Sequence, residues 1–109
     1  MKFALSAFRG YNTTKGKNME KPDKPIQWSS EKNQILWETR DLSFEAIVIA
    51  MDKGKLITSY AHPKIAHQRI FEVEIEDYVV AVPYVEEDEK IFLKTAFHSR
   101  KLNRKYRGE

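Results

Sequence analysis

The sequence predicts an α+β protein, with two N-terminal helices, a four-stranded antiparallel sheet and a basic C-terminal helix. Between residues 31 and 53 the apolar residues recur three and four positions apart, which is helical spacing. Between residues 56 and 98 they alternate with polar residues or form short apolar runs, which is typical of strands. Helices and strands therefore occupy separate parts of the chain, and this separation indicates the α+β class.

The first 25 residues differ in composition from the rest of the chain. They combine Gly, Pro, Asn and Thr with six Lys or Arg residues against two acidic residues. This composition predicts a flexible basic tail over residues 1–25 and a single folded domain over residues 26–109. Such a tail can add non-specific affinity for RNA or DNA.

The first helix is predicted between residues 31 and about 40. It follows a short extended segment, residues 26–28, that can add a strand to a sheet edge. Ser30 is the expected N-cap, because its hydroxyl can accept a hydrogen bond from the first turn. The apolar positions of this helix are Ile35, Leu36 and Trp37.

The second helix, from residue 43 to about residue 53, has the clearest pattern in the chain. Ser43 is its expected N-cap and Gly54 its expected C-terminal stop. Apolar residues at positions i, i+3, i+4 and i+7 form one face of the helix, and they are Phe44, Ile47, Val48 and Met51.

The four strands are predicted at residues 56–61, 69–75, 78–85 and 91–98. In the second strand Phe71 and Val73 face one side while Glu72 and Glu74 face the other, so we expect a half-buried strand with a solvated acidic face. The third strand is apolar on both faces, as expected for a central strand. Residues 76–77 are short enough to join these two strands as a hairpin.

The last strand runs directly into a basic segment. Ser99 can cap a helix over residues 100–107, on which Leu102 and Tyr106 can pack back on the sheet. The same spacing makes like-charged neighbours of Arg100 and Arg104, and of Lys101 and Lys105. Like charges repel, and a nearby phosphodiester backbone would offset that cost. An ordinary solvated helix is the alternative.

Charge is divided unevenly along the chain, although the net charge is only +3. Residues 72–89 contain eight acidic residues and no basic one, and residues 90–107 contain seven basic residues and no acidic one. This division suits a basic face for nucleic acid and an acidic edge in solvent. Cysteine is absent, and the apolar N-terminal run is too short for a signal peptide or membrane span. We expect a cytoplasmic protein without membrane contact.

Several kinds of catalytic site are not supported by the sequence. The three histidines do not have metal-binding spacing, the four glycines are scattered, and no serine-based triad can be picked out. We therefore expect no metal and no cofactor. A cationic set remains, which antiparallel strands could bring to one end of the sheet, namely Arg69, Lys94, His98, Arg100, Lys101 and Arg104.

Such a set can cleave RNA without a metal. The 2′-hydroxyl of RNA attacks the adjacent phosphate, so the protein must orient the attack, stabilise the developing charge and move protons. Arginine and lysine stabilise charge, and His98 or Tyr106 can assist proton transfer. The alternatives are a salt bridge between Arg69 and a neighbouring Glu, and a His98 that is bonded only to backbone.

Four segments follow the pattern of a known family: IQWSSEKN, LSFEAIVIA, QRIFEVEI and LKTAFHSRKLNRKY. Through them, residues 26–107 resemble the BrnT-type toxins of bacterial type II toxin–antitoxin systems, which belong to the RelE-like ribonuclease group. Two positions depart from the family pattern. Ser29 stands where an acid is common and His98 where a small residue is common, which leaves the proton-transfer group open.

The resemblance implies a RelE-like fold and an endoribonuclease that inhibits translation and growth. It also implies a partner, a cognate antitoxin that is typically a ribbon-helix-helix DNA-binding protein, with DNA bound only through the toxin–antitoxin complex. The alternative is a non-catalytic module of the same fold that binds nucleic acid or a partner protein. The candidate catalytic residues are Arg69, Lys94, His98, Arg100 and Lys101, and the candidate RNA-binding residues are Lys32, Arg104, Lys105 and Tyr106, of which the resemblance supplies Lys32, Arg69, Arg100 and Lys101.

Overall fold

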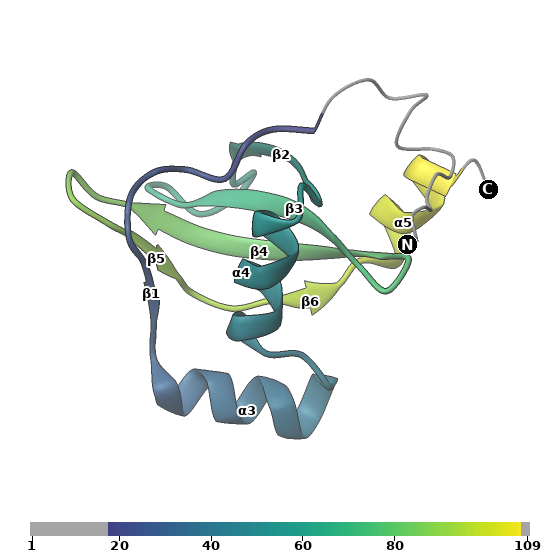
Figure 1. Cartoon of the computed structure of the whole chain (residues 1–109), viewed down its shortest axis with the longest axis horizontal. Helices are drawn as coiled ribbons and strands as arrows, with labels where there is room; N and C mark the ends of the chain where they lie inside the picture. Colours follow the sequence, from purple (N-terminus) through teal and green to yellow (C-terminus); the bar gives the residue numbers. More distant parts are fainter. Residues whose placement is uncertain (1–17, 108–109) are drawn as a thin grey trace.

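The computed structural model describes residues 18–107, which form an α+β fold around a mixed six-stranded sheet (Figure 1). The helices within these residues are α3 (Ser30–Arg40), α4 (Phe44–Asp52) and α5 (Arg100–Arg107). The strands are β1 (Ile26–Trp28), β2 (Leu56–Ala61), β3 (Arg69–Ile75), β4 (Tyr78–Glu86), β5 (Ile91–Leu93) and β6 (Phe97–His98). The α+β class is therefore confirmed.

The sheet differs in two details from the predicted four antiparallel strands. Its order is β1-β5-β4-β3-β2, with β1 parallel to β5, and β6 pairs with β4 beyond the end of β5. The predicted last strand is thus split into β5 and β6. At the interruption Lys94 N donates to Pro83 O, but Pro83 has no N–H to donate in return, and between the pairs Tyr84–Leu93 and Ala81–Phe97 the last strand advances four positions while β4 advances three. On the side away from β4, Arg40 Nη1 donates to Ala96 O at 2.8 Å.

Helices α3 and α4 lie together on one side of the sheet (Figure 1). Serine hydroxyls cap both of them, since Ser29 Oγ accepts from Lys32 N and Ser43 Oγ accepts from Ala46 N. The cap of α3 is therefore one residue earlier than predicted. Gly54 has a φ of 84° just after α4, as expected for a helix stop that only glycine adopts without strain.

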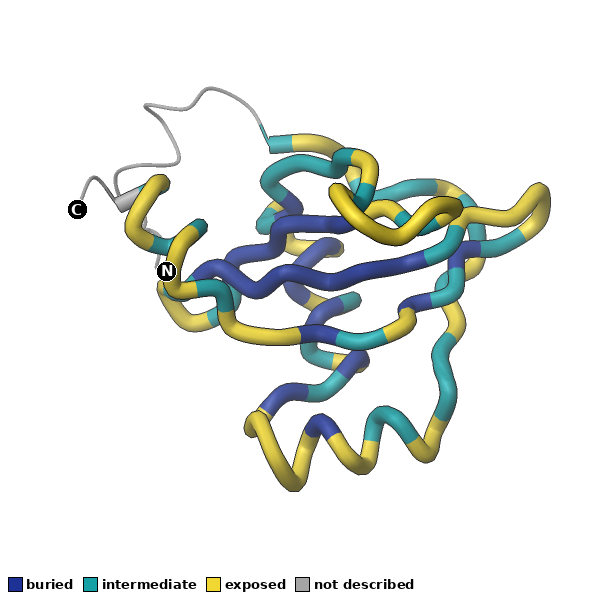
Figure 2. The backbone as a smooth tube through the Cα atoms, turned by 180° about the vertical axis from the view of Figure 1, so that it is seen from behind, coloured by how far each residue is buried: buried dark blue, intermediate teal, exposed yellow. Residues whose placement is uncertain are grey.

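The core lies between these helices and the facing side of the sheet (Figure 2). Helix α4 buries three large side chains in it, those of Phe44, Ile47 and Met51. Each such burial stabilises the fold by about 1.5–3 kcal/mol, so α4 contributes more than its short length suggests. Trp28 of β1 packs on Phe44, with 5.7 Å between the ring centroids.

The hairpin between β3 and β4 has the predicted two-residue turn. Glu76 and Asp77 both have positive φ angles, 52° and 66°, which is the geometry of the turns that match the twist of antiparallel strands. The turn fixes a continuous register between the strands from Ile75–Tyr78 to Arg69–Tyr84.

The acidic face of β3 is buried, contrary to the prediction of a solvated one. The exposed fractions of Glu72 and Glu74 are 1% and 5%. Their neighbours on β4, Val79 and Ala81, are also buried, so this second face of the sheet is covered over its middle. Buried carboxylates require partners, and Lys55 Nζ lies 3.9 Å from Glu74 Oε1.

Part of the predicted basic tail can be compared with the structure. Residues 1–17 lie outside the described residues. Residues 18–25 run along the domain, where Met19 N donates to Leu56 O, Lys21 pairs with Asp52 at 2.6 Å, and Lys24 pairs with Glu86 at 2.9 Å. None of the helices in residues 18–107 has the length and apolar composition needed to cross a bilayer.

Candidate nucleic-acid interface

Helix α5 is fixed to the start of β4 at its N-terminal end. Ser99 caps it as predicted, because Ser99 Oγ accepts from Leu102 N at 3.2 Å. The backbone N–H of Ser99 donates to Val79 O, and Val79 N donates in turn to Asn103 Oδ1. These bonds set the direction in which α5 leaves the sheet.

Tyr106 holds the other end of α5 against the buried carboxylate of β3. Its hydroxyl donates to Glu72 Oε1 at 2.6 Å. Burial raises the pKa of Tyr106, and the hydrogen bond to Glu72 and the charge of that carboxylate raise it further. The same causes raise the pKa of Tyr60 on β2. The hydroxyl of Tyr106, a predicted RNA contact, is thus directed into the protein.

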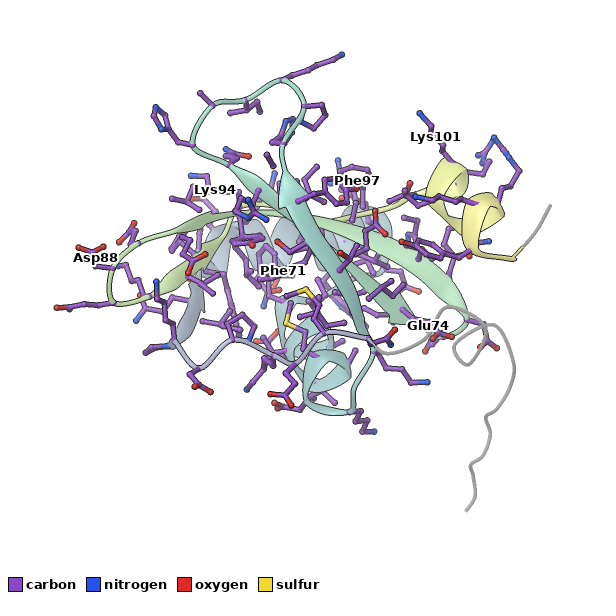
Figure 3. The ribbon with its side chains drawn as sticks, turned by 90° about the horizontal axis from the view of Figure 1, so that it is seen from above. Phe71, Glu74, Asp88, Lys94, Phe97 and Lys101 are labelled. Carbon is purple, nitrogen blue, oxygen red and sulfur yellow. The ribbon has the colours of Figure 1, made fainter. Side chains whose placement is uncertain are left out.

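The outer side of α5 carries four exposed cations, which we call the α5 cations: Arg100, Lys101, Arg104 and Lys105. Within residues 18–107 none of them forms an ion pair. Figure 3 shows Lys101 at one end of the molecule and Asp88, in the acidic turn between β4 and β5, at the other. The acidic residues are divided between the two ends. Residues 86–89 lie far from α5, whereas Glu72 bonds Tyr106 of α5, and the turn at Glu76 and Asp77 joins the end of β4 to which α5 is fixed.

His98 lies next to this helix at the edge of the sheet. It pairs with Val80, and its ring meets that of Tyr78 edge-on with 5.5 Å between the centroids. The exposed His98 lines two open depressions of about 680 Å³ and 250 Å³. Both depressions are also lined by Trp37 and Asp41, from the end of α3. His98 therefore faces a concave surface rather than bulk solvent alone.

The end of α3 is clamped at this surface. Arg40 Nη1 donates to Ala96 O at 2.8 Å and to Thr95 Oγ1 at 3.3 Å, which joins α3 to the connection between β5 and β6. Asp41 adopts the left-handed conformation, with a φ of 59°, and its backbone N–H donates to Leu36 O. The chain reversal at Asp41 places α3 and His98 around the same depressions.

Arg69 lies at a different place in the sheet. Its Nε donates to Ser59 Oγ and to Tyr84 Oη, each at 3.3 Å, and these two hydroxyls share a hydrogen bond of 2.6 Å. Tyr84 also stacks on Phe71, with 3.7 Å between the ring centroids. Among the described residues Arg69 forms no salt bridge with a Glu, so the alternative proposed for it from the sequence is wrong.

Lys94 is near Arg69 along the strands but on the opposite face. Its Nζ lies 5.5 Å from the ring centroid of Phe92, whose side chain alternates with that of the core residue Leu93. Arg69 shares its face with the core residue Phe71. The two cations are therefore separated by the sheet.

The register places both of them away from His98. Arg69 pairs with Tyr84 of β4, whereas His98 pairs with Val80, four residues or about 13 Å along the strand. Lys32 lies in the first turn of α3, about 12 Å along the helix from Arg40. The structure thus leaves Arg69, Lys94 and Lys32 away from α5. His98 precedes α5 by two residues in the chain, but neither depression that it lines includes a residue of α5. The roles of Arg69, Lys94 and Lys32 stay predictions.

Three features of this region were not foreseen from the sequence: the exposure of Trp37, the position of Asp41 and the burial of Glu72. A signal existed for two of them. Successive helical residues point about 100° apart, so Ile35, Leu36 and Trp37 could not all face the core. Strand β4 is apolar on both faces, which implies cover over both faces of its neighbour β3 as well.

The described residues contain no cluster of three or more His, Cys, Asp or Glu side chains that could hold a metal ion. Comparison with known proteins finds no family model, no curated protein and no solved structure that matches the chain. The fold and this surface define a small α+β domain with a cationic C-terminal helix and a depression lined by His98. Its function must be inferred from its own residues.

Proposed function

We propose that this chain is the toxin component of a bacterial type II toxin–antitoxin system and that it cleaves RNA without a metal ion, inhibiting translation. The observation that supports this most is the position of His98, which lines a depression two residues before the exposed α5 cations begin. The resemblance of residues 26–107 to BrnT-type toxins, with their RelE-like fold, supports it independently.

The chemistry needs charge stabilisation and proton transfer at one phosphate. Arg100 and Lys101 are cations that can neutralise the charge developing on a phosphate while the 2′-hydroxyl attacks. The imidazole of His98 can take or give a proton near neutral pH. The catalytic site that we propose therefore consists of these three residues, and Arg69 and Lys94 are not part of it.

The decisive experiment compares two double variants with equal loss of charge. Arg100→Ala/Lys101→Ala should abolish cleavage of RNA by the purified chain in the presence of a chelator, because the phosphate loses its cations. Lys53→Ala/Lys64→Ala removes two exposed cations outside this surface and should cleave at the wild-type rate. Intact RNA after incubation with the wild type, together with harmless expression in growing cells, would contradict the proposal.

A second candidate function is a non-catalytic module that binds nucleic acid or a partner protein. The separation of Arg69 and Lys94 from the α5 cations favours it, because fewer cations then converge on one phosphate. It predicts RNA binding that weakens steeply with salt but gives no cleavage products. The wild-type cleavage assay therefore distinguishes the two candidates directly.

The proposed partner is an antitoxin of the ribbon-helix-helix type with an acidic segment for the α5 cations. Covering these cations would block RNA and neutralise like charges that lie one turn apart. Co-expression with the product of the adjacent gene should restore growth, and the two proteins should form a stable complex. The Arg100→Ala/Lys101→Ala variant should bind that product more weakly.

A further inference from the structure

Trp37 is exposed to an unusual degree for a tryptophan in a small domain. Its exposed fraction is 58%, although it lies in a helix that packs on the core through Leu36. Within residues 18–107 the Trp37 side chain makes no hydrogen bond or ring contact, and it lines both depressions beside His98. Exposed aromatic side chains are the groups on which proteins stack single-stranded bases.

Two aromatic rings and one carboxylate are the residues that the two depressions share: Trp37, His98 and Asp41. Trp37 lies in the last turn of α3 and Asp41 is its left-handed C-cap residue, and both line the two depressions. His98 reaches the same depressions from β6. The clamp from Arg40 to Ala96 holds the two elements in place, so the site is largely formed without a ligand.

The carboxylate of Asp41 restricts what can bind. Within residues 18–107 it has no hydrogen bond or ion pair, and a carboxylate only accepts. The Watson–Crick edge of guanine presents two adjacent donors, N1–H and N2–H₂. Adenine and cytosine present one amino group beside an acceptor nitrogen, and uracil presents one N–H between two acceptors. Guanine alone matches both carboxylate oxygens.

We infer that Trp37, His98 and Asp41 bind an unpaired guanine base of RNA, with the base stacked on Trp37 and its Watson–Crick edge at Asp41. This inference rests on the proposed function for RNA as the substrate class. The base must be unpaired, because pairing would occupy the edge that Asp41 reads. The adjoining phosphates would then lie toward Arg100 and Lys101, two and three residues after His98.

The two tryptophans of the chain allow a direct test. Titration of the purified chain with guanosine 5′-monophosphate should quench the emission of Trp37, while Trp28, half-buried against Phe44, should not respond. The Trp37→Phe variant should therefore lose the quenching. By calorimetry, inosine 5′-monophosphate, which lacks the N2 amino group, should bind more weakly, and adenosine 5′-monophosphate more weakly still.

Variants separate stacking from edge recognition. Trp37→Ala should weaken binding of guanosine 5′-monophosphate by about 5- to 150-fold, the usual contribution of one stacked base. Asp41→Asn keeps a residue that tolerates the left-handed conformation and should lose the preference for guanine over adenine. Ile35→Ala, which removes another exposed apolar side chain of α3 outside both depressions, should bind as the wild type does.

The outcomes keep this inference apart from the proposed function. Equal affinity for guanosine and adenosine monophosphates, or no binding of either, overturns the guanine site even if RNA is cleaved. Guanine-selective binding that depends on Trp37 and Asp41 supports the site even if no RNA is cleaved, and the catalytic proposal then fails alone. If both the guanine site and the catalytic proposal hold, the cleavage products of RNA should map next to unpaired guanines.

Discussion

At the scale of single residues, Glu72 shows how a strand pattern can mislead. Alternation along β3 correctly separates Phe71 and Val73 from Glu72 and Glu74, but alternation does not tell which face meets solvent. The sequence therefore predicted the side of the strand and not its environment. The hydroxyl of Tyr106, 34 residues away, makes the burial of Glu72 tolerable, and such a pair is invisible in local sequence.

Removing that hydroxyl gives a stability prediction. Tyr106→Phe should lower the free energy of unfolding by about 1–2 kcal/mol, because a buried carboxylate loses a hydrogen bond. Urea denaturation measures the change. Tyr78→Phe is the matched control, since the hydroxyl of Tyr78 has no hydrogen bond within residues 18–107, and it should unfold like the wild type. A loss of equal size in both variants would contradict the role of Glu72.

The two tyrosines at Glu72 also predict how stability depends on alkaline pH. Their pKa values are raised above the ordinary 10.0 in the folded state, so the folded protein keeps protons that the unfolded chain has lost. Their contribution is complete below pH 10 and should decline as the pH rises above it. The Tyr60→Phe/Tyr106→Phe variant should show a flatter stability profile between pH 9 and 11, measured against the wild type. If the variant shows the same slope of stability against pH as the wild type, these two tyrosines are not the source of that slope.

At the scale of secondary-structure elements, the sequence predicts correctly the features that depend on bonds between neighbouring residues. The serine caps, the stop at Gly54 and the turn at Glu76 and Asp77 all depend on side chains or φ angles within a few residues. The hydrogen bond from Arg40 to Ala96 could not be predicted, because the two residues are 56 positions apart in the chain. The candidate site could not be predicted for the same reason, since this hydrogen bond joins α3 to the segment that precedes His98.

The N-cap of α5 provides a prediction at this scale. Ser99→Ala should cost about 1 kcal/mol of stability and should also weaken RNA binding, because the first turn carries Arg100 and Lys101. Ser29→Ala removes the equivalent cap of α3, in which Lys32 N donates to Ser29 Oγ at 3.1 Å. It should cost similar stability with RNA affinity unchanged. Equal RNA affinity of the Ser99→Ala and Ser29→Ala variants would show that α5 is not part of the RNA interface.

At the scale of the whole molecule, one of the two acidic runs, residues 86–89, lies far from the α5 cations (Figure 3). The acidic turn that contains Asp88 and the helix that contains Lys101 lie at opposite ends (Figure 3). An approaching polyanion would be repelled from one end and attracted to the other, which orients it before contact. The charge division at residue 90 of the sequence is not reproduced in space, because Glu76 and Asp77 lie at the end of β4 that holds α5. The predicted convergence of Arg69 and Lys94 with α5 depended on the strand register, which composition does not reveal.

Salt dependence tests which cations share one RNA strand. Four phosphate contacts by the α5 cations give a slope of about −3 for the logarithm of the binding constant against the logarithm of salt concentration. Arg104→Ala/Lys105→Ala should reduce the magnitude of that slope by about 1.4. Arg69→Ala/Lys94→Ala should leave it unchanged, because those cations lie at the other end of β4 and on opposite faces. A reduced slope in the second variant would mean that RNA spans the molecule.

The parallel pairing of β1 with β5 has a consequence for how the chain folds during synthesis. Ile26 pairs with Ile91, so the sheet edge closes only after 65 further residues have been added. Helix α5 comes later still, after the strand to which it is fixed. We expect the sheet edge and α5 to reach their places only after the strands from β2 to β6 have been made.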